Sequence, residues 1–345
     1  MPRRPTTEQL IRDLLAEYEP EMQKAFLEAV QEMRDGVQLQ QLVEALKARN
    51  LEAAIAAVNI DRAVFRELEN VYAKAFEAGG VVGAGGFPKV PDPNGGVVIV
   101  RFDTRMPTAE RILREASSTM VTRISNDTKT MLRTVMSEGL EVGRGPMAMA
   151  TDIAGRVSRT SNRREGGILG MTSVQERAVS SARQKLLSGD PSQMREYLGL
   201  KLRDKRFDRT VLKAINEGAP VSREMVGKIT GRLTDRYVQF RAETVARTET
   251  LGSVNAGRHE AFRQGLDKTE YTEQDVTREW DDAGDAKVRN DHRGVSKVRG
   301  LSQPFDVGGS LMMHPGDTSL GAGAEQVINC RCVEKIKIDF FRGMA

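Results

Sequence analysis

Apolar side chains recur at three- and four-residue intervals from residue 6 to residue 78, and charged residues fall mainly on the other faces. This period places the apolar side chains on one side of a helix. The pair Thr6-Thr7 can cap the first helix, and Pro20 predicts a break or kink within it. We therefore expect an N-terminal helical region over residues 1–78.

The pattern changes over residues 79–100, which are dense in glycine and proline. Because both residue types disfavour a helix, we expect no helix to persist there. Residues 79–96 are expected to form a linker or a long surface loop instead. The apolar run Val97–Val100 that follows predicts one short strand.

Helical periodicity returns in a middle region, residues 101–230. Residues 108–139 predict one long helix or two, with a thin apolar stripe that is typical of a helix lying against a partner. Shorter helices follow over residues 192–231, with a turn at residues 218–220. We expect this region to be helical throughout.

Basic residues precede a glycine pair in the middle region. Arg163 and Arg164 stand before Gly166-Gly167, and Thr172 or Ser173 can cap the helix that follows. The free amides of such a turn could hold an anion, although a plain helix start explains the same pattern. The arginines also raise direct DNA binding as an alternative to a solvated charged face. Four further basic residues lie downstream: Lys201, Arg203, Lys205 and Arg206.

A long helix with a polar, small-residue face is expected from about residue 231. Thr248 and Asn255 stand seven residues apart on this face. Polar side chains are costly to bury unless they are hydrogen-bonded. We therefore expect Arg247 and Glu249 to make fixed hydrogen bonds to a neighbouring layer, with solvent exposure as the alternative.

After this helix apolar and polar residues alternate, which is the pattern of a strand. Residues 271–280 and residues 332–338 predict strands. Asp285 is expected to cap a short helix that reaches His292, and a loop rich in Gly, Ser and Pro is expected over residues 296–323. The expected fold class is α+β: a predominantly helical N-terminal two-thirds, followed by a small α+β C-terminal module over residues 231–345.

Composition narrows the classes of protein to consider. The chain has 345 residues, which favours two or three domains, and its net charge is only +4. No stretch approaches the roughly 20 apolar residues of a membrane span, and the basic N-terminus has no apolar core behind it, so we expect neither a membrane protein nor a secretion signal. Two cysteines cannot form a disulfide framework, which indicates a reducing, cytoplasmic origin.

Both cysteines and two of the three histidines lie near the C-terminus. His292, His314, Cys330 and Cys332 make a set of four ligands of the kind that structural zinc takes. The spacing matches no standard zinc finger, and buried cysteines that act as small apolar residues are the alternative. Three carboxylates could replace one of these ligands: Asp285, Asp291 and Asp317.

A catalytic role for the thiols is not favoured by their position. Cys330 and Cys332 come just before or inside an expected strand, whereas a helix N-terminus would lower a thiol pKa. The sequence contains no serine nucleophile elbow, phosphate loop or dinucleotide fingerprint. We therefore expect no catalytic residues and a protein that is not an enzyme.

Four segments of the C-terminal region carry a family resemblance: "ARTETLGSVNAGRHEAF", "REWDDAGDAKVRNDH", "HPGD" and "NCRC". In this order and spacing they resemble the phage Mu protein F-like family of minor head, or head morphogenesis, proteins, over about residues 235–340. The upstream segment "RREGGILGMTSVQERAVSSARQKL" is similar to extended members. The positions that match the family pattern are Arg247, Thr248, Glu249, Asn255, Trp280, Asp285, Arg289, His292, Pro315, Asp317, Asn329, Cys330 and Cys332. The sequence after His292, "RGVSKVRG", lacks the Asp-Gly turn that the family often has at this place.

The resemblance implies a virion assembly protein. Such a protein is made in the host cytoplasm and lies inside the head near the portal, where it acts in procapsid assembly, genome packaging or DNA ejection. The implied partners are the portal protein, scaffold or major capsid protein, and packaged DNA. The alternative is a phage-delivered effector enzyme, a NAD- or nucleotide-using transferase joined to a Mu F-like module. This alternative requires a set of catalytic residues within residues 1–230.

Overall fold

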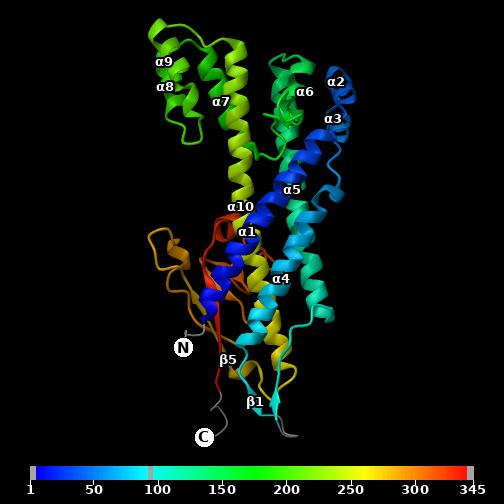
Figure 1. Cartoon of the computed structure of the whole chain (residues 1–345), viewed down its shortest axis with the longest axis vertical. Helices are drawn as coiled ribbons and strands as arrows, with labels where there is room; N and C mark the ends of the chain where they lie inside the picture. Colours follow the sequence, from blue (N-terminus) through cyan, green and yellow to red (C-terminus); the bar gives the residue numbers. More distant parts are fainter. Residues whose placement is uncertain (1–4, 92–95, 340–345) are drawn as a thin grey trace. The chain divides into compact units, whose positions relative to one another are not determined.

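A computed structural model describes residues 5–91 and 96–339. Residues 92–95 of the expected linker or loop, and both chain ends, lie outside this description. The structure divides into two compact units that each combine separated stretches of chain. The first unit comprises Met1–Ala25, Glu67–Met120 and Glu243–Ala345, and the second comprises Phe26–Arg66 and Val121–Ala242. The expected fold class is confirmed: the chain is α+β, with helices over most of its length and small sheets near its C-terminus (Figure 1).

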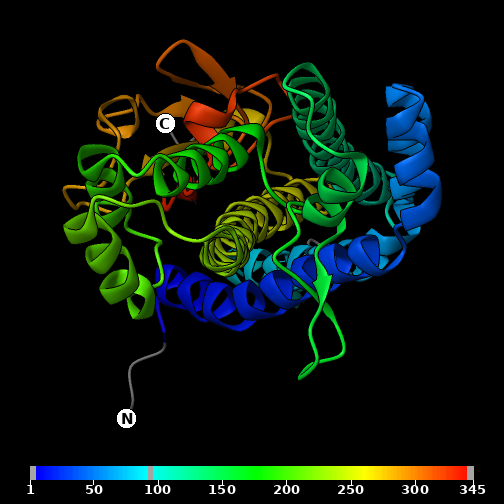
Figure 2. The ribbon, with the colours of Figure 1, turned by 90° about the horizontal axis from the view of Figure 1, so that it is seen from above.

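The second unit is built from helices and one short hairpin. It contains parts of α1 (Thr7–Asp35), α5 (Pro107–Glu141) and α10 (Arg223–Leu266), together with α2 (Leu39–Lys47), α3 (Leu51–Val58), η1 (Arg62–Phe65), α6 (Pro146–Ala154), α7 (Ser173–Leu187), α8 (Pro191–Leu198), η2 (Lys205–Phe207) and α9 (Asp208–Glu217). The hairpin pairs β3 (Arg156–Val157) with β4 (Arg164–Glu165). Figure 2 shows α7, α8 and α9, in green, as neighbouring helices.

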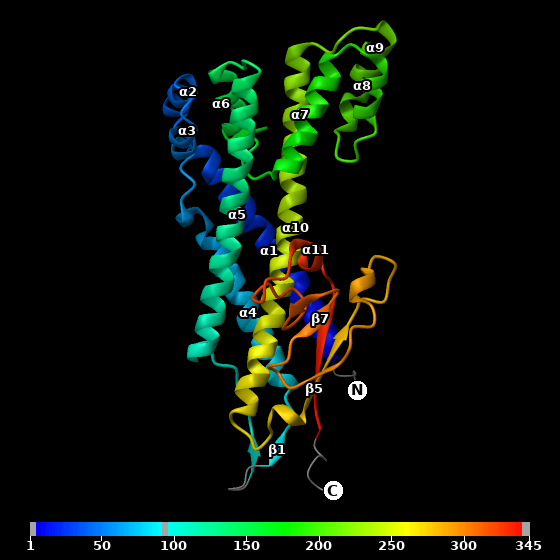
Figure 3. The same ribbon diagram turned by 180° about the vertical axis from the view of Figure 1, so that it is seen from behind.

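The first unit combines the remaining parts of the three long helices with α4 (Arg66–Gly86) and the small sheets. Its other elements are β1 (Val90–Pro91), β2 (Val97–Val98), η3 (Glu273–Asp275), β5 (Val276–Asp281), η4 (Asn290–His292), β6 (Val298–Arg299), β7 (Phe305–Val307), β8 (Ser310–Met312), α11 (Ala324–Val327) and β9 (Val333–Ile338). The antiparallel sheet has the order β6-β5-β9, and β7 pairs with β8. Figure 3 shows β5, β7 and α11 on one side of the C-terminal part of α10.

Strand β5 buries alternate residues, and two of its three inward positions are apolar. Val276 and Trp280 are inward apolar residues, but the inward residue between them is Arg278. In the antiparallel register Trp280 lies opposite Glu334 of β9, which is also fully buried. The inner face of this sheet therefore carries opposite charges as well as apolar side chains.

The prediction that no helix persists beyond residue 78 is wrong, because α4 continues to Gly86. Helix α4 runs beside the C-terminal part of α10 (Figure 1), and its Gly79 and Gly83 lie against the backbone of α10. A Cβ atom at Gly79 would lie 2.3 Å from the Val254 carbonyl oxygen. A Cβ at Gly257 of α10 would lie only 2.0 Å from the Phe76 carbonyl oxygen. Each glycine costs the helix about 1 kcal/mol of intrinsic stability, but the close backbone packing requires it.

Other expected boundaries also shift. Helix α1 continues unbroken through Pro20, and α10 begins at Arg223 rather than near residue 231. The stretch expected as a loop, residues 296–323, contains β6, β7 and β8. Asp285 caps no helix to His292; it accepts a hydrogen bond from the Lys287 amide, and η4 is a single 3-10 turn.

Several local predictions are confirmed. Residues 108–139 lie in one helix, α5. Thr172 caps α7, and Gln175 completes a capping box, since each side chain bonds the backbone of the other residue. A short strand begins at Val97, and the last strand spans Val333–Ile338.

In the described residues no helix is both long enough and apolar enough to cross a membrane.

Replacing Gly257 with alanine tests the close helix contact. The new methyl group would overlap the Phe76 carbonyl oxygen, so we expect the free energy of unfolding to fall by about 1–3 kcal/mol. Gly85→Ala is the matched control, because a Cβ there has nothing within 4 Å and alanine favours a helix. Urea denaturation of both variants measures the difference. Equal stabilities would contradict the role assigned to Gly257.

Candidate metal centre

Three predicted ligands meet in the first unit. His292 ends η4, and Cys330 and Cys332 lie between α11 and β9. The His292 Nδ1 atom lies 3.4 Å from Cys332 Sγ and 3.6 Å from Cys330 Sγ. All three side chains are buried, and their ligand atoms lie within 4.8 Å of one another. This group could hold a metal ion.

The spacing of these atoms suits tetrahedral coordination. Zinc binds imidazole nitrogen at about 2.0–2.1 Å and thiolate sulfur at about 2.3 Å, so a tetrahedral angle separates nitrogen and sulfur by about 3.6 Å. The two nitrogen–sulfur distances, 3.4 and 3.6 Å, match this value. The donors need little movement to share one ion.

Neighbouring side chains orient the imidazole of His292. Its Nε2 atom lies 2.9 Å from Gln326 Oε1, and the Gln326 amide nitrogen in turn donates to Asp291 Oδ2 at 3.3 Å. A proton on Nε2 leaves the lone pair of Nδ1 directed at the two sulfurs. Metal-binding histidines commonly have such a partner on the second ring nitrogen.

The two thiols differ in acidity. The hydrogen bond from Cys332 lowers the pKa of Cys330, although burial acts in the opposite direction. The same hydrogen bond, together with burial, raises the pKa of Cys332. A metal ion binds both groups as thiolates, so its binding would displace their protons.

The structure separates His314, the fourth predicted ligand, from this group. Its ring lies beside His259, with centroids 5.9 Å apart, and its Nδ1 atom lies 3.3 Å from the Pro315 carbonyl oxygen. Burial lowers the pKa of His314 and favours its neutral form. Within residues 5–91 and 96–339, the group able to share a metal ion has three members, without His314.

The three carboxylates named as substitute ligands have other roles. Asp291 accepts from Gln326, as described above, and Asp285 forms an ion pair with Arg331 at 2.6 Å. Asp317 accepts backbone hydrogen bonds from Met313 at 2.7 Å and from Ser319 at 2.8 Å. None of the three belongs to the metal-capable group in the described chain.

Aromatic and backbone contacts hold the metal-capable group in place. Trp280 packs edge-on against His292, with ring centroids 5.4 Å apart. Arg289 donates to the Ile328 carbonyl oxygen just before the cysteines. Asn329 has a φ of 54°, and its amide donates to Thr248 Oγ1 at 3.1 Å. These contacts fix the turn that presents Cys330.

A buried charge network connects strands β5 and β9, and the sequence patterns did not predict it. Arg278 and Glu334 are both fully buried, and Arg278 Nη1 lies 2.7 Å from Glu334 Oε1. Arg278 also donates to three backbone carbonyl groups, and its guanidinium lies 4.8 Å from the Phe305 ring centroid. The accepting residues are Gly300, Gln303 and Met313. The sequence feature that could have predicted this network is a charged residue at an inward position in each of two strands: Arg278 in β5 and Glu334 in β9.

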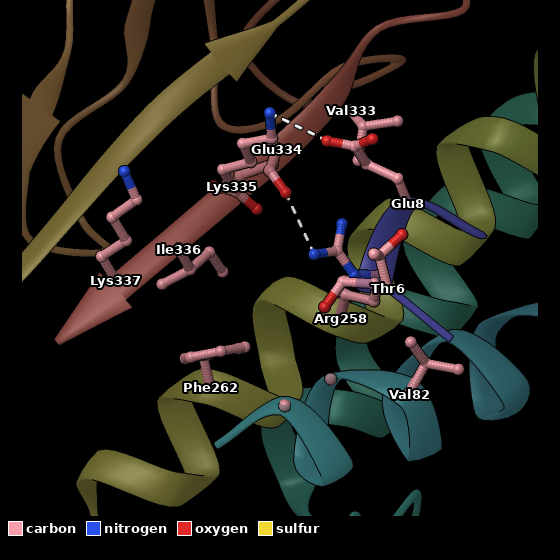
Figure 4. Close-up of a pocket in the computed structure, with 13 residues that line it drawn as sticks. Thr6, Glu8, Val82, Arg258, Phe262, Val333, Glu334, Lys335, Ile336 and Lys337 are labelled. Atoms are coloured by element: carbon pink, nitrogen blue, oxygen red, sulfur yellow. Dashed lines mark hydrogen bonds and ion pairs between the residues drawn. The ribbon is translucent and has the colours of Figure 1, made fainter. Parts of the chain in front are cut away.

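Helix α10 reaches the same strand through two side chains. Arg258 donates to the Glu334 backbone oxygen at 3.0 Å, a contact drawn in Figure 4, which also shows the ion pair between Glu8 and Lys335. His259 Nδ1 lies 3.4 Å from Glu334 Oε1. Burial alone would raise the pKa of the Glu334 carboxyl, but His259 and Arg278 outweigh it and lower the pKa to about 2.

The polar face predicted on α10 is largely engaged. Asn255 donates to the Pro315 carbonyl oxygen at 3.0 Å, and Thr248 accepts from Asn329 as noted. Glu249 is buried. Arg247 is half-exposed, with a carboxylate oxygen of Glu19 4.0 Å away. The expected fixed contact is therefore weakest at Arg247.

The glycine turn proposed as an anion site already faces a carboxylate of this chain. The Gly166 amide donates to Asp235 Oδ1 at 2.9 Å, and the Gly167 carbonyl oxygen accepts from Arg34. Arg164 donates to the Gly155 carbonyl oxygen at 3.0 Å, while Arg163 is exposed. The downstream arginines form the ion pairs Arg203–Asp208 and Arg206–Asp204. These contacts do not favour a free anion site here.

Comparisons with known proteins give no relative: no family model, curated protein or solved structure matches the chain.

Replacing Glu334 with glutamine tests the buried network. Removal of one partner of a buried ion pair leaves the Arg278 charge uncompensated, so we expect the free energy of unfolding to fall by about 3 kcal/mol at neutral pH. Glu325→Gln is the control, because it removes the same charge from an exposed position. Chemical denaturation measures both variants, and a similar small loss in each would contradict the assigned role.

The pH dependence follows from the lowered pKa of Glu334. Since the pKa falls from an ordinary 4.5 to about 2 in the folded chain, the carboxylate stabilises the fold above pH 4.5. This stabilisation is lost as the pH falls from 4.5 to about 2, because the carboxylate then becomes protonated in the folded chain as well. We expect the wild-type chain to lose stability more steeply than Glu334→Gln between pH 4.5 and 2, measured by thermal melts. Parallel curves would rule out this contribution.

Proposed function

We propose that this chain is a phage minor head protein. It acts at the portal vertex in procapsid assembly, genome packaging or DNA ejection, inside the virion head, after synthesis in the host cytoplasm. The resemblance in the C-terminal region supplies the proposal. Its support in the structure is that the residues carrying the resemblance contact one another across long stretches of sequence.

These contacts join three separate segments. Asn255 on α10 bonds the Pro315 carbonyl group, and Thr248 bonds the amide of Asn329. A further contact, the packing of Trp280 on His292, lies within the single segment of residues 278–292. The residues that carry the resemblance thus act mainly as ties within one module, which supports an assembly role over a catalytic one.

The alternative is a phage-delivered effector enzyme that uses NAD or a nucleotide. It would place chemistry in residues 1–230, which contain no histidine. No contact described above favours this alternative.

We further propose that the metal-capable group binds zinc. One imidazole nitrogen and two thiolate sulfurs are preferred donors for this ion, and their spacing fits its tetrahedral bond lengths. Zinc would tie η4 to the segment before β9. The binding free energy would then add to the stability of the module.

Co-purification tests the assembly proposal. The full chain should be used, because the module packs on distant residues such as Ile11 and Ala75. We expect tagged full-length protein, co-expressed with a portal protein from the genome that encodes the chain, to retain that protein in a fixed ratio. An unrelated portal protein serves as the control. Failure to co-purify would remove the portal from the proposed partners.

Metal content tests the zinc proposal. We expect about one zinc per chain by mass spectrometry, and a large loss of zinc in Cys332→Ser and His292→Ala. His314→Ala is the matched control and should retain zinc, because His314 lies outside the group. A chelator should lower the melting temperature of the wild-type chain. Zinc loss in His314→Ala would restore the four-ligand set predicted from the sequence.

A further inference from the structure

Strand β9 forms one edge of the antiparallel sheet β6-β5-β9. In an antiparallel pair, every second residue bonds the neighbouring strand, and the residues between turn their amide and carbonyl groups the other way. Asp339 donates to the Asp275 carbonyl oxygen at 2.8 Å, whereas the Glu334 carbonyl oxygen accepts a hydrogen bond from α10 at 3.0 Å. The backbone groups of Glu334, and by alternation those of Ile336 and Ile338, therefore point away from β5.

This edge has a substitute for a partner strand at one end. Arg258 of α10 bonds the Glu334 carbonyl oxygen there. Among the described residues, no backbone group or side chain bonds the amide or the carbonyl oxygen of Ile336 or Ile338. Unpaired backbone groups along an edge strand are a template for pairing with a further extended chain.

A trough of about 270 Å³ runs beside this edge. Five consecutive residues of β9, Val333–Lys337, line it, and the rest of its lining comes from the start of α1, from α4 and from α10. Figure 4 shows Ile336 of β9, Phe262 of α10 and Val82 of α4 among the lining side chains. All of these residues belong to the first unit. The trough therefore offers an apolar surface to a side chain beside Ile336.

The geometry of a sheet fixes how an added strand would lie. Its backbone would run about 4.8 Å from β9, and its side chains would face the trough and the outer face of the sheet in turn. A residue opposite Ile336 would face the trough, where an apolar side chain fits. A residue opposite Lys337 would lie on the outer face.

The outer face carries excess positive charge at Lys337. The Glu279 carboxylate is shared by two lysines, Lys297 at 2.6 Å and Lys337 at 2.9 Å, and the Lys337 side chain is 62% exposed. Lys335, in contrast, already contacts two carboxylates. Opposite charges on directly opposed residues of neighbouring strands are stabilising. A carboxylate in the added strand is therefore favoured opposite Lys337.

A second copy of this chain does not fit the edge. Antiparallel pairing of two β9 strands centred on Ile336 would place Lys335 opposite Lys337 of the second copy. Like charges directly opposite each other are destabilising, and lysines on edge strands commonly prevent self-pairing. The charge pattern thus favours a different chain with an acidic residue.

We propose that the free edge of β9 binds an extended segment of a partner protein as an additional antiparallel strand. The segment has apolar residues that face the trough and an acidic residue opposite Lys337. Main-chain hydrogen bonds to Ile336 and Ile338 hold the segment, and its alternate side chains give selectivity. This inference depends on neither the zinc proposal nor the assembly proposal.

Amide hydrogen exchange of the full chain, followed by NMR, tests the strand addition. In the free chain, we expect the Ile336 and Ile338 amides to exchange faster than those of Lys335 and Lys337, which face β5. The probe is the end-blocked peptide Thr-Val-Glu-Val-Thr, which should slow exchange at Ile336 and Ile338 by about tenfold or more. The matched control is the same peptide with N-methyl groups on both valines. It keeps the side chains but cannot donate the main-chain hydrogen bonds, so it should not protect these amides.

A charge exchange at Lys337 tests the acidic residue. We expect Lys337→Glu to bind the glutamate peptide several-fold more weakly than the wild type does, measured by fluorescence anisotropy of labelled peptides. The same variant should bind the peptide Thr-Val-Lys-Val-Thr several-fold more tightly, which shows that its edge is still intact. An unchanged preference between the two peptides would overturn the assignment of an acidic residue opposite Lys337.

Three outcomes would overturn the strand addition itself. Absence of protection by the unmodified peptide at millimolar concentration, or equal protection by the N-methylated peptide, would exclude main-chain pairing. Protection of Ile336 and Ile338 already in the free chain would show that the edge is occupied. Its occupant would be a second copy if the protection increases with protein concentration, and another part of the same chain if it does not.

Discussion

The ion pair between Arg278 and Glu334 is the contact on which the C-terminal module depends. Taking each charge out of water costs several kcal/mol, and the pair repays this only when the remaining polar atoms are also bonded. Arg278 meets that condition by donating to carbonyl groups in two loops, those at Gly300 and Gln303 and at Met313, whereas Glu334 Oε2 has no hydrogen-bond partner among the described residues. The buried charge thus adds polar contacts to loops that also bury Leu301, Phe305 and Met312.

The metal-capable group adjoins the charge network, because Cys332 immediately precedes strand β9, which carries Glu334. Cys332 and Glu334 are two residues apart, so they point to the same side of an extended chain, and both are buried. Trp280 connects the two sites, because it lies opposite Glu334 in the sheet and packs on His292. A displacement of β9 would therefore disturb both sites together. Binding of the proposed zinc ion would therefore add to the stability of this strand and of the network on it.

This organisation is consistent with the proposed role as a head protein. A protein that docks on a larger assembly needs a surface held in one shape before binding, since ordering it during binding would weaken the contact. Asn255 and Thr248 provide such order by bonding the loops at Pro315 and Asn329 to α10. The same contacts keep Cys330 at the wall of a cavity that solvent can reach.

Local patterns by themselves determined much of the secondary structure. The helical period, the Thr172 cap and the last strand were predictable because they depend on neighbouring residues along the chain. Pairing of His292 with the two cysteines was also foreseen from residue type. The exclusion of His314 was not, because it depends on which loops meet in space.

Tertiary packing decided the remaining features. Glycine was interpreted as a helix breaker, but Gly79 and Gly257 allow two helix backbones to touch, and only the partner helix reveals this. Arg278 and Glu334 look like surface charges in sequence, since a single strand does not show what lies opposite it. The sequence alone determined where the helices and the last strand form; distant contacts decided which polar residues are buried, because burial is tolerated only when a partner from elsewhere in the chain arrives.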